Sequence, residues 1–233
     1  MPVHNGSKTV ARAIDSVANQ SIGCERLHFV IVENNSTDNT VNEVQNSLVK
    51  NPNLSYSLIF EEKKGIVFAL NKGLIDFARD YPYIARIDAD DIWHFDKLKR
   101  QISFLERNPE VHIVGTQIEF ISDTTLPAGA TPPKYPTGDR QIKQWLSSQQ
   151  NPIAHPSVVY RREILSGLGG YSDLYPMAED YDFWLRAMKH YNFANIDEIL
   201  VSYNFSSNPN YKPLSPQLAC HSAMQAYKYL HNG

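Results

Sequence analysis

Three aspartates, Asp88, Asp90 and Asp91, lie close together directly after a short apolar stretch. Crowded carboxylates repel one another unless they hold a cation, accept hydrogen bonds or face water. Mg²⁺ and Mn²⁺ take one or two carboxylates together with phosphate oxygens and water. Arg86 projects from an extended strand to the same side as Asp88 and Asp90, because side chains alternate along a strand. The pattern therefore predicts a Mn²⁺ or Mg²⁺ site on Asp88 and Asp90, whereas Asp91 is equally well explained as a helix cap.

Other sites that use clustered carboxylates or phosphate-binding loops do not match the sequence. An EF-hand loop needs a Gly two residues after Asp90 and a closing Glu, and a haloacid-dehalogenase-like phosphatase needs a Thr where the chain has Ile92. The chain has no GxGxxG and no GxxxxGK[ST] motif, which argues against dinucleotide-binding Rossmann folds and P-loop folds. With a net charge of −3 and a pI of about 6.2 there is no basic field, so we expect no nucleic-acid partner.

Strand-like and helix-like segments alternate over the first 120 residues. Short apolar runs predict strands at 27–32, 54–60, 83–87 and 111–120. Helical periodicity predicts helices at 8–20 with Ser7 as N-cap, after Thr37 or Asp38, after Gly65 and after Asp96. This rhythm predicts an α/β fold, with a doubly wound, mostly parallel sheet flanked by helices. Ligands bind such sheets beyond the carboxyl ends of the strands, where the polar runs 33–38 and 88–91 fall.

The rhythm changes after residue 120. Residues 122–138 hold four prolines and are predicted to form a loop. The pattern then predicts helices near 139–149 and 179–190, a strand near 193–203 and a C-terminal helix at 214–231. We therefore expect one domain over 1–205 and a helical extension over 206–233.

The first strand is the exception to this alternation. A doubly wound sheet needs a strand before its first helix, and only the residues MPVHN are left for it. We expect this strand to be truncated, and we expect the natural chain to extend upstream with a short run of Val, Ile or Leu.

Six segments together resemble the family 2 glycosyltransferases. They are Pro2 to Gly6, VENNSTDNT (32–40), GIVFALNKGL (65–74), ARIDADDIW (85–93), NPIAHPS (151–157) and AEDYDFWLRA (178–187). Each motif alone is weak, but six in the same order and spacing are specific, and they span residues 2–205. The resemblance is to bacterial enzymes that build capsule, exopolysaccharide and lipopolysaccharide chains, and it implies a GT-A type fold.

The resemblance implies a nucleotide-sugar donor, in the first instance a UDP-hexose, and inversion at the anomeric carbon. In the family the strand-end Asp-x-Asp binds the ribose and the metal–diphosphate, which assigns Asp88 to the ribose or a metal-bound water and Asp90 to the metal. An Asp-Asp pair that reads the base in the family is replaced here by Glu33 and Asn34, so the nucleobase stays open. The implied donor-binding residues are Pro2, Val3, Asn5, Glu33, Asn34, Arg86 and Asp88.

The resemblance also implies a catalytic base. In the family an Asp on the helix after a Gly-Gly-Tyr turn takes the proton of the acceptor hydroxyl, and the matching residue here is Asp180. The alternative for Asp180 and its neighbour Glu179 is a favourable interaction with the helix macrodipole. Glu179, His155, Trp184 and Asp91 are further candidates for substrate contacts, although core packing explains Trp184 better.

Partners and localisation follow from these implied roles. We expect 1–120 to bind the nucleotide sugar and 121–205 to hold the base and a glycan or lipid-linked acceptor. Since the sequence has no signal peptide and no apolar run of about 18 residues, we expect a cytoplasmic protein. Peripheral contact with the inner face of the cell membrane stays open, through tyrosines and lysines between Tyr203 and Tyr229. Two other functions also stay open: a nucleotide-sugar-binding module without catalysis, and a metal-dependent nucleotidyltransferase.

Overall fold

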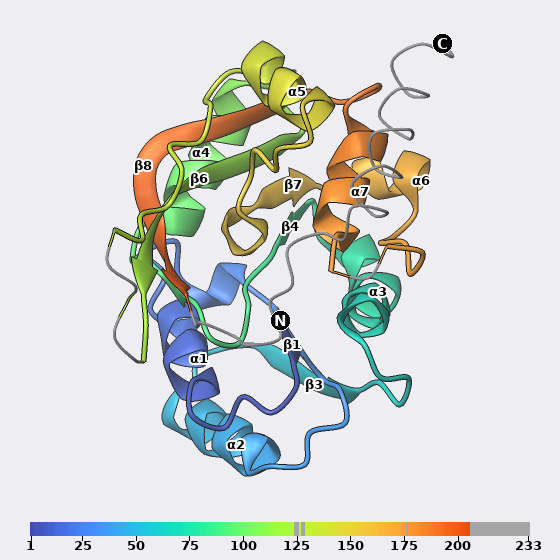
Figure 1. The fold of residues 1–233 in the computed structure, drawn as a ribbon. Helices are drawn as coiled ribbons and strands as arrows, with labels where there is room; N and C mark the ends of the chain where they lie inside the picture. The colour runs from blue at the N-terminus through green and yellow to red at the C-terminus, as the bar shows by residue number, and fades with distance from the viewer. Residues whose placement is uncertain (124–125, 127–128, 176, 206–233) are drawn as a thin grey trace.

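Within the described residues the predicted helices and strands occur in the predicted order, and the structure adds short strands at Ile92–Trp93 and Val159–Arg161 and a short helix at Ile164–Leu168 that the sequence did not predict. The computed structural model describes residues 1–123, 126, 129–175 and 177–205 (Figure 1). The helices are α1 (Val10–Ala18), α2 (Thr40–Lys50), α3 (Ile66–Phe77), α4 (Lys97–Arg107), α5 (Asp139–Ser147), α6 (Ile164–Leu168) and α7 (Glu179–Ala187). The strands are β1 (Pro2–Val3), β2 (Phe29–Glu33), β3 (Tyr56–Phe60), β4 (Tyr83–Ala85), β5 (Ile92–Trp93), β6 (Ile113–Ile121), β7 (Val159–Arg161) and β8 (Phe193–Asn204).

The strands form two sheets rather than one. The first sheet is parallel throughout and has the order β1-β2-β3. The second has the order β4-β7-β6-β8-β5, in which β6 and β8 are parallel and the other neighbours are antiparallel. The predicted α/β class holds, and the first strand is short as expected. Parallel crossovers do not extend to β4, however, because β7 pairs with β4 and β6 in the antiparallel direction.

The first helix begins later than the sequence predicts. Ser7 is not its N-cap, since α1 starts at Val10 with Thr9 in the capping position and without a side-chain capping bond. The backbone N–H groups of Thr9 and Val10 donate to Gly6 O at 3.0 and 2.9 Å, so a turn precedes the helix. Ser7 N–H instead donates to the Asp38 carboxylate at 3.1 Å. The segment before α1 is thereby tied to the turn before α2.

The core divides into two clusters that meet at the second sheet. One packs α1, α2 and α4 against the sheets, with Ile14, Ile31 and Val114 fully buried. The other surrounds β7 and α7, with Phe183 and Trp184 fully buried. Figure 1 shows α7 beside α6 and β7, on the side of the molecule where α3 lies. This packing brings the start of α7 towards the half of the fold that contains β4.

The predicted helix at 214–231 and the predicted extension 206–233 lie outside the described residues. In the part of the chain that the structure describes, no helix is both long and apolar enough to cross a membrane.

Candidate functional site

A cleft of about 790 Å³ opens where the carboxyl end of β1, the turn after β2, the start of α3 and the segment after β4 come together. Such a place, beyond the ends of parallel strands, is where α/β sheets bind ligands. The lining includes Pro2, Val3, Asn5, Lys8, Asn34, Asp38, Lys64, Gly65, Asp88, Asp90, Asp123 and Asn204. The structure therefore brings five of the predicted donor-site residues to this cleft, together with the predicted metal ligand Asp90.

Arg86 and Asp88 form an ion pair at the end of β4. The Arg86 Nη2 atom lies 2.5 Å from Asp88 Oδ1, and the two side chains are 4% and 27% exposed. The Arg86 backbone N–H donates to Val158 O at 3.1 Å, so the strand pairing with β7 continues just past β4 and holds Arg86 in place. A buried guanidinium needs a carboxylate partner because desolvation of an unpaired charge is costly. Arg86 itself is therefore placed to hold Asp88 at the cleft rather than to line the cleft.

Asp90 and Asp91 have raised pKa values but different surroundings. Burial, and then the charge of Asp88, raise the pKa of Asp90 to about 6. Burial also raises the pKa of Asp91, whose Oδ1 atom accepts Asn204 N–H at 2.7 Å and whose Oδ2 atom has no partner among the described residues. Asp90 lines the cleft and Asp91 does not. Asp91 thus anchors the end of β8, and its predicted substrate contact has no support in this placement.

The residues around Asp90 fit a divalent cation. Two carboxylates at the cleft carry charge that burial makes costly, and a bound cation would stabilise both in their charged form. No group of three or more His, Cys, Asp or Glu side chains with metal-binding geometry occurs in the described residues. A site of two carboxylates fits Mg²⁺ or Mn²⁺ only if phosphate oxygens and water complete the shell.

The turn after β2 holds the predicted base-reading residues in unexpected roles. Glu33 folds back on its own turn, where its carboxylate accepts the backbone N–H groups of Asn35 and Ser36 at 3.3 and 2.6 Å. Asn34 donates to Glu61 O and Lys63 O at 2.9 Å each and accepts Gly65 N–H at 2.8 Å. Both side chains therefore organise the turns around the cleft, and only Asn34 lines it.

Asn5 and Asp38 tie the first turn of the chain to the turn before α2. The Asn5 side chain accepts Thr37 N–H at 2.8 Å, and the Asn5 backbone takes a positive φ of 51° that asparagine tolerates well. Asp38 accepts the Thr40 hydroxyl and the N–H groups of Thr40 and Ser7, the latter two at 3.0 and 3.1 Å. These bonds, chiefly the one from the Thr40 hydroxyl, hold the pKa of its carboxyl below the ordinary value. The N-cap of α2 is Asn39 rather than Thr37 or Asp38, although Asp38 accepts the N–H of Thr40, the first residue of the helix, and also lines the cleft.

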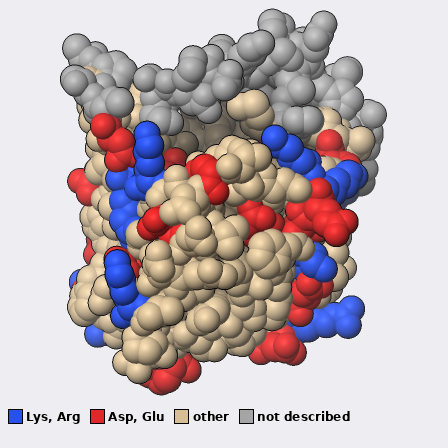
Figure 2. Space-filling model, turned by 90° about the horizontal axis from the view of Figure 1, so that it is seen from below, with Lys and Arg blue, Asp and Glu red and all other residues tan. Residues whose placement is uncertain are grey.

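Two lysines at the cleft were not singled out from the sequence. Lys8 and Lys64 line it, and Lys64 directly precedes Gly65, the residue before α3. Cations and a helix N-terminus both favour an anion such as a diphosphate. The signal in the sequence was the run KKG before an apolar helix, which is too common to carry a prediction alone. Elsewhere charges of both signs are interspersed, as Figure 2 shows for the face seen from below.

Asp180 and Glu179 begin α7 and carry raised pKa values. Asp180 is half-buried, and burial raises its pKa although it accepts the Asn151 side-chain N–H at 2.6 Å and Tyr181 N–H at 2.7 Å. Glu179 is buried, and burial followed by the charge of Asp180 raises its pKa to about 7. Arg86 lowers the pKa of both carboxyl groups, and Asp88 contributes to the raised pKa of Glu179. Glu179 and Asp180 therefore lie close enough to the Arg86–Asp88 ion pair to feel its charges. They lie next to the cleft rather than in its lining.

His155 and Trp184 lie beneath this region and do not open to the cleft. His155 is buried with its Nε2 atom 3.0 Å from Tyr171 Oη, and burial lowers its pKa well below the ordinary value. The ring of His155 packs edge-on against Trp184, which is fully buried. The structure thus places both as packing residues, as was expected for Trp184 and not for His155.

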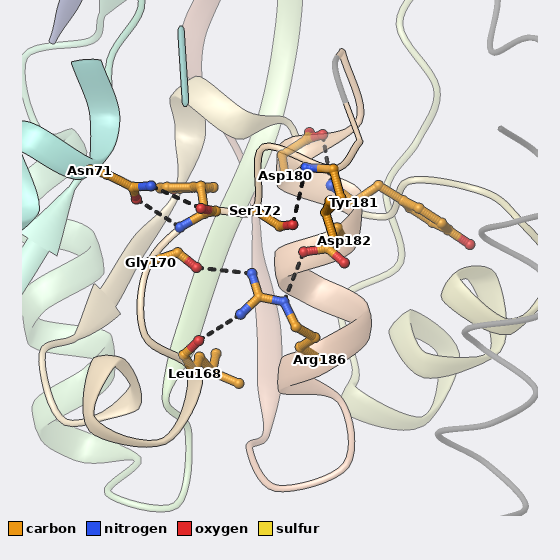
Figure 3. Close-up of polar contacts among 10 residues, drawn as sticks. Asn71, Leu168, Gly170, Ser172, Asp180, Tyr181, Asp182 and Arg186 are labelled. Atoms are coloured by element: carbon orange, nitrogen blue, oxygen red, sulfur yellow. Dashed lines mark hydrogen bonds and ion pairs between the residues drawn. The ribbon is translucent and has the colours of Figure 1, made fainter. Parts of the chain in front are cut away.

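The loop between α6 and α7 is held by two side chains from different elements. Arg186 of α7 pairs with Asp182 at 2.8 Å and donates to Leu168 O and Gly170 O at 2.7 and 2.9 Å (Figure 3). Asn71 of α3 donates to Tyr171 O and accepts Tyr171 N–H, both at 2.8 Å. Gly170 is required here, since a Cβ atom on it would lie 2.2 Å from the Asn71 Oδ1 atom. These contacts fix the start of α7 relative to α3.

We expect Arg186→Ala to lower the free energy of unfolding by about 2–3 kcal/mol. The substitution leaves the nearly buried Asp182 carboxylate without its cation and removes donors from two loop carbonyls. Urea unfolding followed by circular dichroism measures this change. Arg186→Lys keeps the positive charge but not the planar guanidinium group. Its free energy of unfolding should therefore lie between that of the unmodified protein and that of Arg186→Ala. An unchanged midpoint in Arg186→Ala would show that the loop is held by other contacts.

The family model described as "Glycosyl transferase family 2" matches residues 1–169. This chain belongs to glycosyl transferase family 2. The match covers β1 to β7 and α1 to α6, including every residue named in the cleft lining except Asn204, and it ends ten residues before Glu179.

Glycosyltransferases from several organisms are similar to this chain. An uncharacterized glycosyltransferase of Methanocaldococcus jannaschii is 27% identical over 88% of this chain and 68% of its own length. The UDP-Gal:alpha-D-GlcNAc-diphosphoundecaprenol beta-1,3-galactosyltransferase of Escherichia coli is 26% identical over 84% of this chain and 69% of its own length. The amylovoran biosynthesis glycosyltransferase AmsB of Erwinia amylovora is 28% identical over 88% and 68%. The chain spans about two thirds of these relatives, and 64% of an uncharacterized Haemophilus influenzae glycosyltransferase.

Solved structures confirm the GT-A type fold of this family 2 chain. S. aureus TarS in complex with UDP-GlcNAc superposes with a TM-score of 0.75 at 16% identity, over 100% of this chain and 65% of that one. The mannosyltransferase PcManGT of Pyrobaculum calidifontis, in complex with GDP-Man and Mn²⁺, gives a TM-score of 0.66 at 18% identity, over 99% and 72%. At these identities the likeness is one of fold.

Proposed function

We propose that the protein transfers a sugar, with inversion, from a nucleotide-sugar donor to a hydroxyl group of a glycan or lipid-linked acceptor. The observation that carries this proposal is the cleft at the strand ends, which is lined by Asp88 and Asp90 together with Lys8 and Lys64. Membership of family 2 supports the reaction class. The donor that we would test first is a UDP-hexose, since TarS was solved in complex with UDP-GlcNAc and the Escherichia coli relative is named as a UDP-Gal-dependent galactosyltransferase.

Donor binding follows from the charges around the cleft. A diphosphate carries negative charge, which Lys8, Lys64 and the N-terminal end of α3 favour. Asp90 and Asp88 would hold a Mn²⁺ or Mg²⁺ ion. When bound, this ion would neutralise the negative charge that develops on the departing diphosphate. Arg86 fixes Asp88 in position through their ion pair. Asn5 and Asn34 stay predictions as contacts to the nucleoside.

Sugar transfer needs a group that takes the proton of the acceptor hydroxyl. Asp180 fits this role, because its carboxylate is held by Asn151 in a half-buried position and its raised pKa makes it a better proton acceptor than an ordinary aspartate. As the hydroxyl oxygen bonds to the anomeric carbon, its proton passes to Asp180 and the bond from that carbon to the diphosphate oxygen breaks. One displacement from the opposite face inverts the anomeric configuration.

The acceptor class is proposed from the relatives. Those matched include enzymes named for amylovoran and O-antigen biosynthesis and one named for a diphosphoundecaprenol-linked acceptor. We therefore propose a role in bacterial surface polysaccharide synthesis, at the cytoplasmic face of the membrane. The segment of the chain that would provide membrane contact, 206–233, lies outside the described residues.

A direct test of this proposal is a donor screen with the purified protein. Nucleotide sugars are added with Mn²⁺ or Mg²⁺, and the melting temperature is measured for each, because a ligand that binds only the folded state raises it. Released nucleoside diphosphate is then quantified for each donor that binds. Binding without release, with any acceptor offered, would favour the non-catalytic binding module. Release of sugar 1-phosphate in place of nucleoside diphosphate would favour a nucleotidyltransferase, because nucleotidyl transfer from a nucleotide sugar leaves that product.

The pH profile of turnover is expected to depend on Asn151. Only the ionised form of Asp180 accepts a proton, so the rate falls as pH falls through its raised pKa. The bond from Asn151 stabilises the charged carboxylate, and Asn151→Ala should therefore raise this pKa further. We expect the acidic limb of kcat to move to higher pH by about one unit. The exposed neighbour Gln150→Ala serves as control and should leave the limb in place. If the acidic limb of the kcat profile stayed in place in Asn151→Ala, Asp180 would not be the group that accepts the proton in the rate-limiting step.

A further inference from the structure

Two polar side chains of α1 are bonded to the segment of the chain that carries Asp90. Arg12 and Ser16 lie four residues apart, so they share one side of the helix. Arg12 Nη2 donates to Asp90 O at 3.1 Å, and Ser16 Oγ accepts Trp93 N–H at 3.1 Å. The backbone between β4 and α4 is therefore bonded to α1 at two points.

The row of polar side chains continues just past the end of α1. Gln20, four residues further along, donates to His94 O at 2.8 Å and accepts Leu98 N–H at 3.0 Å. The opposite side of α1 is packed in the core, where Ile14 is fully buried. The backbone that leads into α4 is therefore held against a helix that is itself fixed.

Arg12 is held in turn by a carboxylate from the end of another strand. Asp123, two residues after β6, accepts a bond from Arg12 Nη1 at 2.6 Å and one from Nη2 at 3.2 Å. A two-point contact of this kind fixes the orientation of the planar guanidinium as well as its position. The hydrogen bond from Arg12 lowers the pKa of the Asp123 carboxyl, which therefore stays charged at neutral pH.

Asp123 is also connected to the end of β8. Asn204 Nδ2 donates to Asp123 Oδ2 at 3.3 Å, and Asn204 N–H donates to Asp91 Oδ1 at 2.7 Å. Figure 1 shows the ends of β6 and β8 beside α1. The bonds thus run from the Asp90 carbonyl through Arg12 and return to the residue after Asp90.

The turn that carries Asp90 has little support of its own. Asp91 N–H closes this turn on Asp88 O with a long bond of 3.3 Å. A carboxylate that binds a cation must be held to within about 0.5 Å of its productive position. Groups that hold a metal ligand in place therefore affect metal affinity without touching the metal.

We propose that Arg12 is a positioning residue for the metal site, which directs the Asp90 carboxylate into the cleft by holding the Asp90 carbonyl. Asp123 keeps Arg12 in place for this role. The inference rests on the proposed function, in which Asp90 binds Mn²⁺ or Mg²⁺. Arg12 does not line the cleft, so it acts through Asp90 rather than by contact with the donor.

The test measures Mn²⁺ affinity by calorimetry, without nucleotide and with UDP, in Arg12→Lys and Arg12→Met. We expect each substitution to weaken Mn²⁺ binding by about 10-fold, because neither new side chain can bond to the Asp90 carbonyl and to Asp123 together. Arg140→Lys, at an exposed arginine of α5, is the control and should leave the affinity unchanged. The melting temperature should fall by no more than about 3 °C, since the Arg12–Asp123 pair is partly exposed.

The direction of the change separates positioning from charge. Arg12 is positive and repels a cation, so the loss of its charge in Arg12→Met would by itself tighten Mn²⁺ binding. Unchanged or tighter binding in Arg12→Met, beside normal binding by the unmodified protein, would overturn this inference and leave the proposed function standing. Binding that weakens only together with a large loss of thermal stability would assign Arg12 to the fold and also overturn it. No Mn²⁺ binding by the unmodified protein, with or without UDP, would refute the metal assignment itself and this inference with it.

Discussion

Replacing Asp180 with asparagine is expected to lower the turnover number for sugar transfer by about 10²–10⁴-fold, with donor affinity unchanged. The asparagine keeps the size of the side chain, and its one oxygen can still accept Tyr181 N–H, whereas the second Asp180 oxygen, which accepts from Asn151, is replaced by an amide nitrogen. What is lost is the group that takes the proton of the acceptor hydroxyl. Steady-state kinetics with varied acceptor, together with calorimetric titration of the donor, separate the two quantities.

Glu179→Gln is the matched control for Asp180→Asn. Glu179 is the neighbouring carboxyl group, its pKa is raised to about 7, and its Oε2 atom has no partner among the described residues. If Asp180 is the base, Glu179→Gln should retain most of its turnover. The reverse result, with Glu179→Gln inactive and Asp180→Asn active, would assign the proton transfer to Glu179. Full turnover in both Asp180→Asn and Glu179→Gln would show that neither carboxyl group at the start of α7 takes the proton of the acceptor hydroxyl.

Asp90→Ala is expected to abolish metal-dependent donor binding and to lower turnover by about 10³-fold or more. Asp90 is the carboxylate that lines the cleft beside Asp88, and its pKa is raised by burial and then by the charge of Asp88, both of which a bound cation would offset. Titration of Mn²⁺ followed by calorimetry measures the metal affinity directly, with and without nucleoside diphosphate. Removal of metal from the unmodified protein with EDTA should give the same loss, reversed by added Mn²⁺.

Asp91→Asn is the control for the metal site. Asp91 belongs to the same cluster of acidic residues, but it accepts Asn204 N–H at the end of β8 and does not line the cleft. An asparagine at this position can still accept that bond, so Mn²⁺ affinity should be retained. Equal loss of Mn²⁺ affinity in Asp91→Asn and Asp90→Ala would place the metal on a different set of ligands. Retained affinity in both would exclude a metal at this strand end.

Local patterns in the sequence were enough to place most elements and the acidic cluster. The apolar spacing of α1 predicted the face with Val10, Ile14 and Val17, all of which are buried. The short apolar runs predicted β2, β3 and β6 to within a few residues. Asp88 and Asp90 were expected at a strand end and lie just beyond β4 at the cleft. In each case the signal is a periodicity or a residue type within one segment.

Contacts between distant segments could not be predicted in this way. The pairing of Tyr83 with Arg161 and of Ile84 with Tyr160, which makes the second sheet mixed, joins segments that carry no shared pattern. Asn71 and Tyr171 lie 100 residues apart, and the bidentate contact between them depends on the packing of α3 against the loop before α7. Such contacts arise from tertiary packing, which residue spacing does not encode.

Glu33 shows how local backbone geometry can redirect a side chain. The sequence placed a carboxylate after the second strand, and the resemblance gave it a role in reading the base. In the structure Asn35 takes a positive φ of 62°, and the tight turn brings the N–H groups of Asn35 and Ser36 back to the Glu33 carboxylate. The Glu33 carboxylate thus accepts hydrogen bonds within its own turn rather than lining the cleft.

A crystal structure of the protein with UDP and Mn²⁺ bound tests the central claim most directly. The account predicts a metal ion at about 2.0–2.3 Å from an oxygen of Asp90, with the diphosphate on its other side towards Lys64. It also predicts that the Asp180 carboxylate faces the same space, within reach of the position that a donor sugar would occupy. A metal bound away from Asp90, or an Asp180 carboxylate turned from the bound nucleotide, would contradict the account.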